Sequence, residues 1–257
     1  MSEITSFAAL GDSFTEGLND PSAAGDGFVG WADRLAVALA ENSPDPAGFR
    51  YANLAVRGRL LDGVIAEQLP RVRKLKPDLI SFTAGGNDIL RPGSDPDALA
   101  ERFEAAVTQL LEITPRVLVC TGFDTRNALV LSLIRGKVAT YNSHLRAICD
   151  RHGLTTVDLW SLKPLHDQRA WSHDRLHLAP AGHERVARLA ALRLGLDGVG
   201  DPFEPFTDPL PWISPSARRR ENLRWAREHL VPWIGRRLRG ESSGDTVTAK
   251  RPDLLPL

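Results

Sequence analysis

Residues 4–17 read ITSFAALGDSFTEG, an apolar run that passes directly into small polar residues. The apolar part, residues 4–10, has the length and composition of a buried β-strand, and the glycine, aspartate and serine after it are typical of a turn. Similar short apolar runs follow along the chain at residues 49–54, 79–84, 117–121 and 154–159. Five strands are therefore predicted, each of which leads into a loop.

Helical patterns stand between these runs. Apolar residues recur every three to four positions in residues 31–40, 60–75, 98–113, 134–150 and 180–194. Asp95 and Pro96 form the pair expected of an N-cap followed by proline at the first helical position. Because strands that alternate with helices form parallel sheets, we predict an α/β fold whose ligand binds beyond the carboxyl ends of the strands.

The composition is that of a globular protein without a strong electrostatic bias. The 257 residues include 32 Lys and Arg and 32 Asp and Glu, so the formal net charge is zero and no nucleic-acid partner is expected. No apolar run reaches the roughly 20 residues that span a bilayer, and the first residues lack a signal-peptide pattern. We expect a soluble, cytoplasmic protein. Cys120 and Cys149 lack metal or redox spacing and are expected to be reduced core thiols.

The end of the chain differs in composition from the rest. Residues 195–215 are rich in Gly, Pro and Asp and predict a linker, and residues 240–257 have the composition of a flexible tail. We therefore divide the chain into a main domain, residues 1–195, and an appended segment, residues 196–257, that packs on this domain or extends from it.

The appended segment contains an Arg-rich stretch, residues 216–239. It predicts an amphipathic helix that Pro232 kinks or splits. The apolar face of this helix carries Leu223, Ala226, Leu230 and Ile234. Two interpretations stay open. The helix packs its Leu and Trp face on the main domain, or it serves self-association or the binding of nucleic acid, anionic lipid or an acidic partner.

Residues suited to acyl transfer stand in four loops of the predicted fold. Ser13 follows the first strand, Gly58 the second and Asn87 the third, while Asp174 and His177 directly precede the last helix. Because the carboxyl ends of parallel strands meet at one edge of the sheet, we expect these residues to form one site.

Each of these residue types has a defined part in nucleophilic catalysis. A serine hydroxyl attacks an ester when an imidazole takes its proton, and a carboxylate holds the imidazole in the right tautomer. Ser13, His177 and Asp174 fit these three parts. The negative charge of the tetrahedral intermediate needs preorganised donors, for which the candidates are the backbone N–H groups of Ser13 and Gly58 and the side-chain amide of Asn87.

With these blocks, the chain resembles the SGNH hydrolase superfamily of GDSL-like esterases and lipases. The four blocks occur in order, as Gly11-Asp12-Ser13 with Gly17, Gly58, Gly85-x-Asn87-Asp88 and Asp174-x-x-His177. The resemblance implies a three-layer α/β/α sandwich with a five-stranded parallel sheet of the flavodoxin-like type, broad ester hydrolysis and no cofactor. One position departs from the pattern, because Leu178 stands where many family members have a proline after the histidine.

Single motifs in this set carry little weight. Gly-Asp-Ser is ordinary turn chemistry, and Asp12 or Ser13 also suits a helix cap. Residues 240–244, GESSG, match the GxSxG nucleophile pattern, but they follow an Arg-rich helix instead of a strand, and no histidine comes after them. The assignment therefore depends on all four blocks in order.

The neighbouring histidines raise the alternative of a metal site. His166, His173 and His183 show no pair with the spacing of a zinc-binding helix, and a metal on His177 would take the base away from the serine. We predict no metal. Asp158 is the alternative to Asp174 as the carboxylate that orients the imidazole.

The resulting prediction is a carboxylic ester hydrolase that forms an acyl-enzyme on small-molecule esters with short-chain or acetyl groups. Trp171, close to the histidine loop, is a candidate for the pocket that binds the acyl or alcohol group. An acyltransferase would use the same residues with a different acceptor. A binding or scaffold protein that acts through the Arg-rich helix is a further alternative.

Overall fold

The computed structural model describes residues 3–25, 27–128, 130–232, 235 and 244–257. Five parallel strands form one sheet in the order β5-β4-β3-β1-β2, and a sixth strand, β6, pairs with β2 in the antiparallel direction. The strands are β1 (Ser6–Gly11), β2 (Arg50–Asn53), β3 (Leu79–Thr83), β4 (Val117–Cys120), β5 (Thr155–Val157) and β6 (Arg251–Pro256). The five predicted strands are confirmed. The sheet has one strand more than predicted. This strand, β6, forms from residues that the sequence analysis assigned to a flexible tail.

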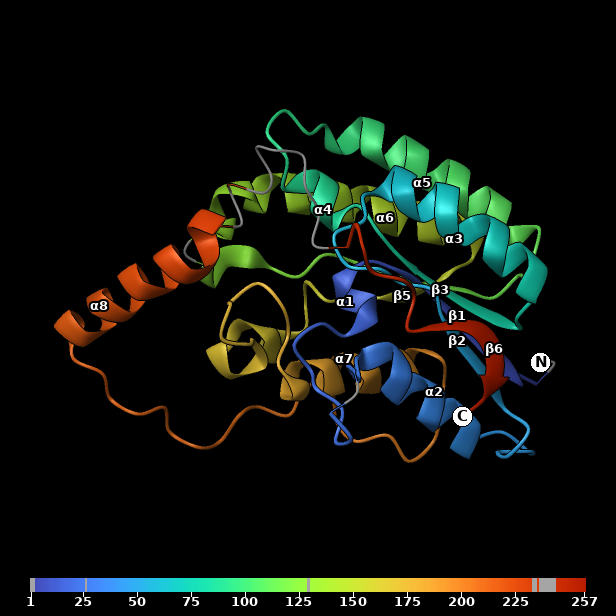
Figure 1. Cartoon of the computed structure of the whole chain (residues 1–257). Coiled ribbons are helices and arrows are strands. Elements are labelled where there is room, and N and C mark those ends of the chain that lie inside the picture. Colours follow the sequence, from blue (N-terminus) through green and yellow to red (C-terminus); the bar gives the residue numbers. More distant parts are fainter. Residues whose placement is uncertain (1–2, 26, 129, 233–234, 236–243) are drawn as a thin grey trace.

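Helices cover both faces of the sheet, so the predicted three-layer sandwich is confirmed (Figure 1). One face carries α3 (Leu61–Leu75), α5 (Pro96–Leu111) and α6 (Arg135–His152), and the other carries α2 (Trp31–Glu41) and α7 (Pro180–Arg193). Two short helices, α1 (Ser13–Glu16) and α4 (Gly86–Ile89), follow β1 and β3. Short 3-10 helices occupy the loops after β4 and β5, at Thr125–Asn127, Leu131–Ile134, Lys163–His166 and Gln168–Ala170. The predicted cap of α5 is also present, since the Asp95 side chain accepts a hydrogen bond from the N–H of Asp97.

The inner strands β1, β3 and β4 are largely apolar runs, because this part of the sheet is buried on both faces. In β1, Ala8 and Leu10 pack with the layer of α3, α5 and α6, whereas Phe7 and Ala9 pack with the layer of α2 and α7. This alternation follows from the two-residue period of a strand. All four side chains are fully buried. The central strand is thereby fixed from both sides, and the loop that leaves it starts from a rigid point.

The strand order reverses at β1, which has β2 on one side and β3 on the other. Connections that leave a sheet in opposite directions open a crevice at the carboxyl ends of the strands. Gly11 at the end of β1 is in register with Thr83 at the end of β3. The loops that carry Ser13 and Asn87 therefore start side by side.

The C-terminal segment follows its predicted course only in part. The helix α8 (Pro215–Trp225) continues as a π-helical stretch, Ala226–Leu230, where a regular α-helix was predicted. A wider turn before Pro232 has a physical reason, because proline donates no N–H and its ring collides with the preceding turn of an α-helix. Ile234 and most of residues 240–244 lie outside the described residues.

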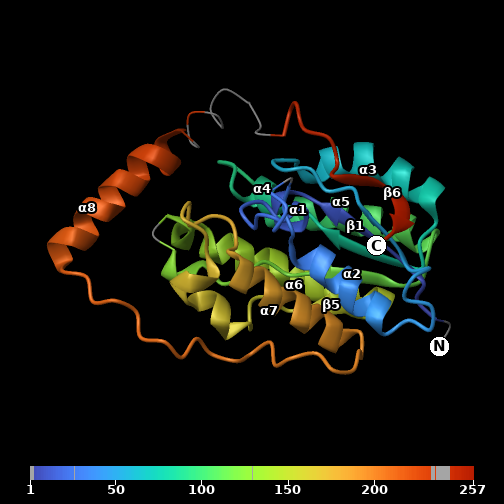
Figure 2. The same ribbon diagram turned by 60° about the horizontal axis from the view of Figure 1, so that its bottom comes forward.

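Helix α8 stands beside the sandwich and does not lie flat on either face (Figure 2). Among its described side chains only Trp225 is buried, whereas Leu223 is 62% exposed. Leu223 therefore does not pack on the main domain as one interpretation of the sequence proposed. After residue 243 the chain returns to the sheet, where β6 extends the edge formed by β2 (Figure 1).

Candidate active site

Gly11, at the end of β1, lies in a space that admits no side chain. A Cβ atom there would come within 2.6 Å of both the Thr15 Oγ1 atom and the Thr83 carbonyl oxygen. The buried Gln68 of α3 binds the backbone of Gly11 twice: its Oε1 accepts from the N–H at 2.9 Å, and its Nε2 donates to the carbonyl at 2.8 Å. The strand therefore ends at a fixed place, two residues before Ser13.

Ser13 is the first residue of α1, and Asp12 is its N-cap. The Asp12 side chain accepts a hydrogen bond from the N–H of Phe14 at 3.0 Å. The cap satisfies one of the free N–H groups at the start of the helix and turns the chain sharply after the strand. The Ser13 hydroxyl is thereby presented at the carboxyl edge of the sheet.

His177 lies between Ser13 and Asp174, which the sequence placed at one site. Its Nε2 atom is 3.0 Å from the Ser13 Oγ atom, and its Nδ1 atom is 2.7 Å from the Asp174 Oδ2 atom. A carboxylate at Nδ1 fixes the proton on that nitrogen, so Nε2 is left as the acceptor for the serine proton. The arrangement is that of a nucleophile, a base and an orienting carboxylate.

Asp174 is held by more hydrogen bonds than its sequence block suggests. Its Oδ2 also accepts from Asn19 Nδ2 at 2.7 Å, and its Oδ1 accepts from Ser172 Oγ at 2.7 Å and from the N–H groups of Leu176 and His177 at 2.9 and 3.0 Å. Burial alone would raise the pKa of Asp174, but the hydrogen bonds and the charge of His177 lower that pKa well below its ordinary value. The carboxylate therefore stays ionised at neutral pH.

Asn19 and Ser172 were missed from the sequence. Asn19 has a left-handed backbone with φ of 72°, and its amide also donates to the Ser172 hydroxyl at 3.0 Å. Asparagine tolerates this conformation better than most residues, and a serine two positions before an aspartate is a common turn pattern. These local signals were available, but neither indicates that two residues so far apart in sequence meet at Asp174.

The candidate oxyanion donors lie in the loops after β1, β2 and β3. Gly58 has φ of 74°, a conformation that favours glycine. The Asn87 Nδ2 atom donates to Asp12 Oδ2 at 3.0 Å and to the Arg59 carbonyl at 3.1 Å, so Asn87 joins the three loops. To donate to an oxyanion, this amide must share or exchange one of these two bonds.

A cavity of about 180 Å³ opens beside Ser13 and His177. Its wall is mainly apolar and includes Ile89, Leu90, Phe123, Leu131, Ile134, Val138, Leu145, Trp171, Leu176 and Leu178. Trp171 is fixed in this wall, since its Nε1 donates to the Leu165 carbonyl at 2.8 Å and its ring packs edge-on against Phe123. The described lining includes Ser13 and Asn87 but not Gly58.

The remaining candidates of the sequence have structural contacts. His183 is buried, its Nδ1 accepts a hydrogen bond from the N–H of Trp31 at the start of α2, and burial lowers its pKa to about 3. Asp158 accepts hydrogen bonds from Arg146 at 2.7 Å and from Thr121 at 3.1 Å, and these contacts hold the loop after β5. Within the described part of the chain, no three His, Cys, Asp or Glu side chains form a group that could bind a metal.

Two expectations from composition can also be compared with the structure. Cys120 and Cys149 are free and buried, as expected. In the portion of the chain that the structure describes, no helix combines the length and apolar character needed to cross a membrane.

The family of the chain follows from its sequence blocks and this geometry together. The model of the GDSL-like lipase/acylhydrolase family matches residues 9–185, a span that contains all the candidate site residues. The chain belongs to the GDSL-like lipase/acylhydrolase family. As a GDSL-like acylhydrolase it is a carboxylic ester hydrolase, and the resemblance stated from the sequence is confirmed. Helix α8 and strand β6 of this acylhydrolase lie beyond the matched span.

Solved structures share the fold of this GDSL-like acylhydrolase. An acetylxylan esterase from Geobacillus stearothermophilus is 21% identical with a TM-score of 0.63, over 77% of this chain and 98% of that one. An α/β hydrolase enzyme from the metagenome of Lake Arreo, Spain, is 19% identical with a TM-score of 0.62, over 76% of this chain and 97% of that one. At such identities the likeness establishes the fold alone. A comparison with curated proteins gave no significant match.

Proposed function

We propose that this acylhydrolase cleaves carboxylic esters with Ser13 as nucleophile, His177 as general base and acid, and Asp174 as the carboxylate that orients the imidazole. One observation carries the proposal: a continuous line of contacts runs from the Ser13 hydroxyl through both imidazole nitrogens to Asp174, with lengths of 3.0 and 2.7 Å. The first length suits proton transfer, and the second is that of a charge-assisted hydrogen bond.

The two half-reactions follow from these contacts between Ser13, His177 and Asp174. As Ser13 Oγ attacks the ester carbonyl, its proton passes to His177 Nε2, and the ionised Asp174 stabilises the resulting imidazolium. The imidazolium then protonates the leaving alcohol oxygen, and the acyl group stays on Ser13. A water molecule next gives a proton to His177 Nε2 and attacks the acyl carbonyl. The carboxylic acid leaves, and the proton returns to Ser13 Oγ.

The oxyanion of each intermediate is assigned to three donors, the N–H groups of Ser13 and Gly58 and the side-chain amide of Asn87. The N–H of Ser13 belongs to the first turn of α1, where free donors favour negative charge. Asn87 is held in place by Asp12 and by the Arg59 carbonyl until the intermediate forms. A charged oxygen then competes well for the amide, because hydrogen bonds to ions are roughly twice as strong as neutral ones.

A solved structure of similar fold supports the assignment of the base and of its orienting carboxylate. The acetylxylan esterase is also known as catalytic mutants in which a serine, an aspartate or a histidine is replaced by alanine, and that aspartate precedes the histidine by three positions. Asp174 and His177 have the same separation.

The cavity supports a longer and more apolar acyl group than the acetyl or short-chain group expected from the sequence. Its wall consists largely of branched aliphatic and aromatic side chains, with Trp171 and Phe123 packed together. Each methylene that enters such a space is stabilised by about 0.8 kcal/mol relative to water. We therefore place an aliphatic acyl chain in this cavity, with its carbonyl at Ser13.

The test is a panel of p-nitrophenyl esters from acetyl to dodecanoyl, assayed with the natural chain and with Ser13→Ala. We expect kcat/KM to rise about fourfold per added methylene until the cavity is full, and Ser13→Ala to be inactive on every ester. A maximum at acetyl would contradict the acyl assignment, and activity in Ser13→Ala would contradict the nucleophile. With alcohols or amines added, the acyltransferase alternative predicts new esters or amides in place of the free acid.

A further inference from the structure

Helix α8 contacts the loop that carries Asp174 and His177, although it lies outside the span shared with the family. The Trp225 Nε1 atom donates a hydrogen bond to the backbone carbonyl of Asp174 at 2.9 Å. Trp225 is only 6% exposed, and none of the other residues in the described helix Pro215–Trp225 is buried. The catalytic loop is therefore the place where this helix is anchored to the body of the protein.

Arg175 makes a second set of contacts with the same helix. Its backbone has φ of 56°, a left-handed conformation that is strained for a residue other than glycine and needs support from its surroundings. Its guanidinium donates to Asn222 Oδ1 at 2.7 Å and to Glu221 Oε1 at 3.3 Å, and it lies over the Trp225 ring at 5.2 Å. One face of α8 thus supports the strained residue that follows Asp174.

The same C-terminal segment also contacts the other side of the active site. Gly244 packs on the backbone of Arg57, where a Cβ atom on the glycine would lie 1.9 Å from the carbonyl oxygen. Asp245 Oδ1 lies 3.7 Å from the Arg59 guanidinium. Because Arg57 and Arg59 flank Gly58, the segment touches the loop assigned to the oxyanion as well as the loop of the base.

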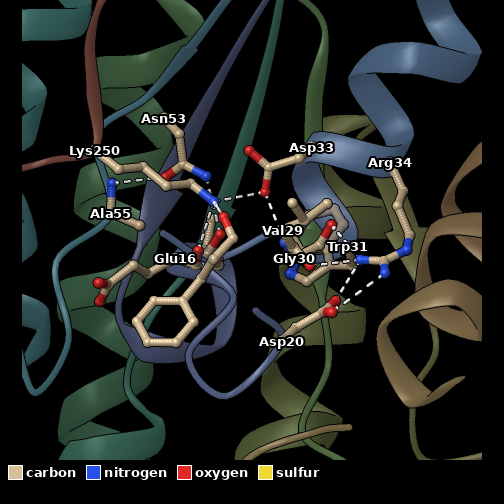
Figure 3. A network of polar contacts seen from close by, with 12 residues as sticks. Glu16, Asp20, Val29, Gly30, Trp31, Asp33, Arg34, Asn53, Ala55 and Lys250 are labelled. Carbon is tan, nitrogen blue, oxygen red and sulfur yellow. Dashed lines mark hydrogen bonds and ion pairs between the residues drawn. The ribbon is translucent and has the colours of Figure 1, made fainter. Parts of the chain in front are cut away.

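Lys250 fixes the end of this segment next to the nucleophile helix (Figure 3). Its Nζ atom donates to the carbonyl oxygens of Glu16 at 2.6 Å and Phe28 at 2.9 Å, and it pairs with Asp33 Oδ2 at 2.6 Å. Glu16 is the last residue of α1, whose first residue is Ser13. From Lys250 the chain enters β6, which pairs with β2.

We propose that residues 215–232 and 244–256 form a clamp on the active site, in which Trp225 and Arg175 are positioning residues that hold the Asp174–His177 pair against Ser13. The inference depends on the proposed function, because the clamp acts only through those three residues. Its physical basis is that proton transfer tolerates little misplacement: a shift of about 1 Å can lower a rate about 100-fold. A loop with a strained residue keeps its geometry only while its neighbours hold it.

The decisive variant is Trp225→Phe, which removes the N–H donor and keeps an aromatic ring under Arg175. We expect kcat to fall about tenfold while KM stays within about twofold, since the loop is displaced and the acyl cavity is intact. The low-field proton resonance of the hydrogen bond between His177 Nδ1 and Asp174 should also shift or broaden. A merely structural tryptophan would leave that resonance unchanged in the folded variant.

Arg175→Ala is the second variant, because the change removes every side-chain contact of Arg175 with α8 and leaves a residue for which φ of 56° is strained. It should lower kcat in the same way, whereas Arg175→Gly, which adopts this backbone conformation without strain, should lose less. Arg219→Ala and Leu223→Ala, on the exposed face of the same helix, are the matched controls and should behave as the natural chain does.

Wild-type kcat and an unchanged resonance in both Trp225→Phe and Arg175→Ala would overturn the clamp. Labelling with a fluorophosphonate separates this failure from failure of the proposed function. If Ser13 is the nucleophile, the reagent modifies Ser13 in the natural chain, whatever the two variants do. A natural chain that hydrolyses esters without labelling at Ser13 would overturn the proposed function itself.

Discussion

The two sides of the active site differ in how completely they are assembled before substrate binds. The base side, Asp174 and His177, has a carboxylate that accepts hydrogen bonds from two side chains outside the pair and from two backbone N–H groups. The oxyanion side, Gly58 and Asn87, has an amide whose described bonds go to Asp12 and to the backbone of a neighbouring loop.

This difference indicates at which stage of the reaction each side of the site is needed. The base must be correctly oriented when the ester arrives, because proton transfer starts the reaction. The oxyanion exists only after attack, so its donor can stay engaged elsewhere until the charge appears. The base side is therefore expected to fail when its supports are removed, and the oxyanion side to fail when the donor itself is removed.

The largest effect is expected from breaking the base side. His177→Ala should lower kcat by about 10³ or more, and Asp174→Asn by a similar factor because the amide favours the wrong imidazole tautomer. Initial rates on a p-nitrophenyl ester measure both, and circular dichroism checks that the variants are folded. Asp158→Asn is the matched control, since Asp158 contacts Arg146 and Thr121. If Asp158→Asn were the inactive variant, the carboxylate would be wrongly assigned.

A somewhat smaller effect is expected on the oxyanion side. Asn87→Ala should lower kcat by roughly 10² to 10³, with little change in KM, because the amide binds the intermediate and not the ester. Asn87→Asp is a useful companion, since it keeps the shape and replaces the donor with an acceptor. If Asn87→Asp retained most of the activity, the side chain would be an anchor of the loops and not an oxyanion donor.

The third largest effect is expected from the side chains that hold Asp174 in place. Asn19→Gly should lower kcat about tenfold, because the change removes one charge-assisted hydrogen bond to Asp174 while glycine keeps the left-handed backbone. Steady-state kinetics with a melting curve distinguish a displaced carboxylate from a destabilised fold. Equal kcat in the natural chain and the variant would show that Ser172 and the backbone donors suffice.

The smallest effect concerns a second histidine near the base, His183. Its folded pKa of about 3 lies below the ordinary value of 6.5, so between these values the unfolded chain binds a proton that folded His183 does not. The free energy of unfolding should therefore fall on acidification, by roughly 1 kcal/mol between pH 6 and pH 5. His183→Asn, which keeps an acceptor for the Trp31 N–H, should lose this part of the slope in urea unfolding at the two pH values. Parallel slopes would contradict the assignment.

The parts of the fold that could be predicted are those with local causes. A strand buried on both faces must be a largely apolar run, and β1, β3 and β4 are such runs. The catalytic candidates could be predicted because Ser13, Asn87 and His177 belong to short blocks placed where strands end or where the last helix begins. The reversal of strand order then brings blocks from distant parts of the sequence to one edge.

The parts that could not be predicted depend on distant partners. Residues 251–256, RPDLLP, contain two prolines and two charges, and they form a strand only because β2 offers an unpaired edge. Asn19 meets Asp174 across 155 positions, and Trp225 meets it across 51. Neither partner has a periodic or local pattern that points to the other. Such contacts arise from the assembled fold and leave no signal in a single sequence.

Strand β6 has a consequence for how molecules of this protein meet one another. A sheet edge exposes a row of unpaired backbone groups, which can template the addition of strands from other chains. In β6, Pro252 and Pro256 carry no N–H, so the new edge cannot present an unbroken ladder. The last strand therefore ends the sheet as well as extending it, and its loss would expose β2 as a surface for edge-to-edge aggregation.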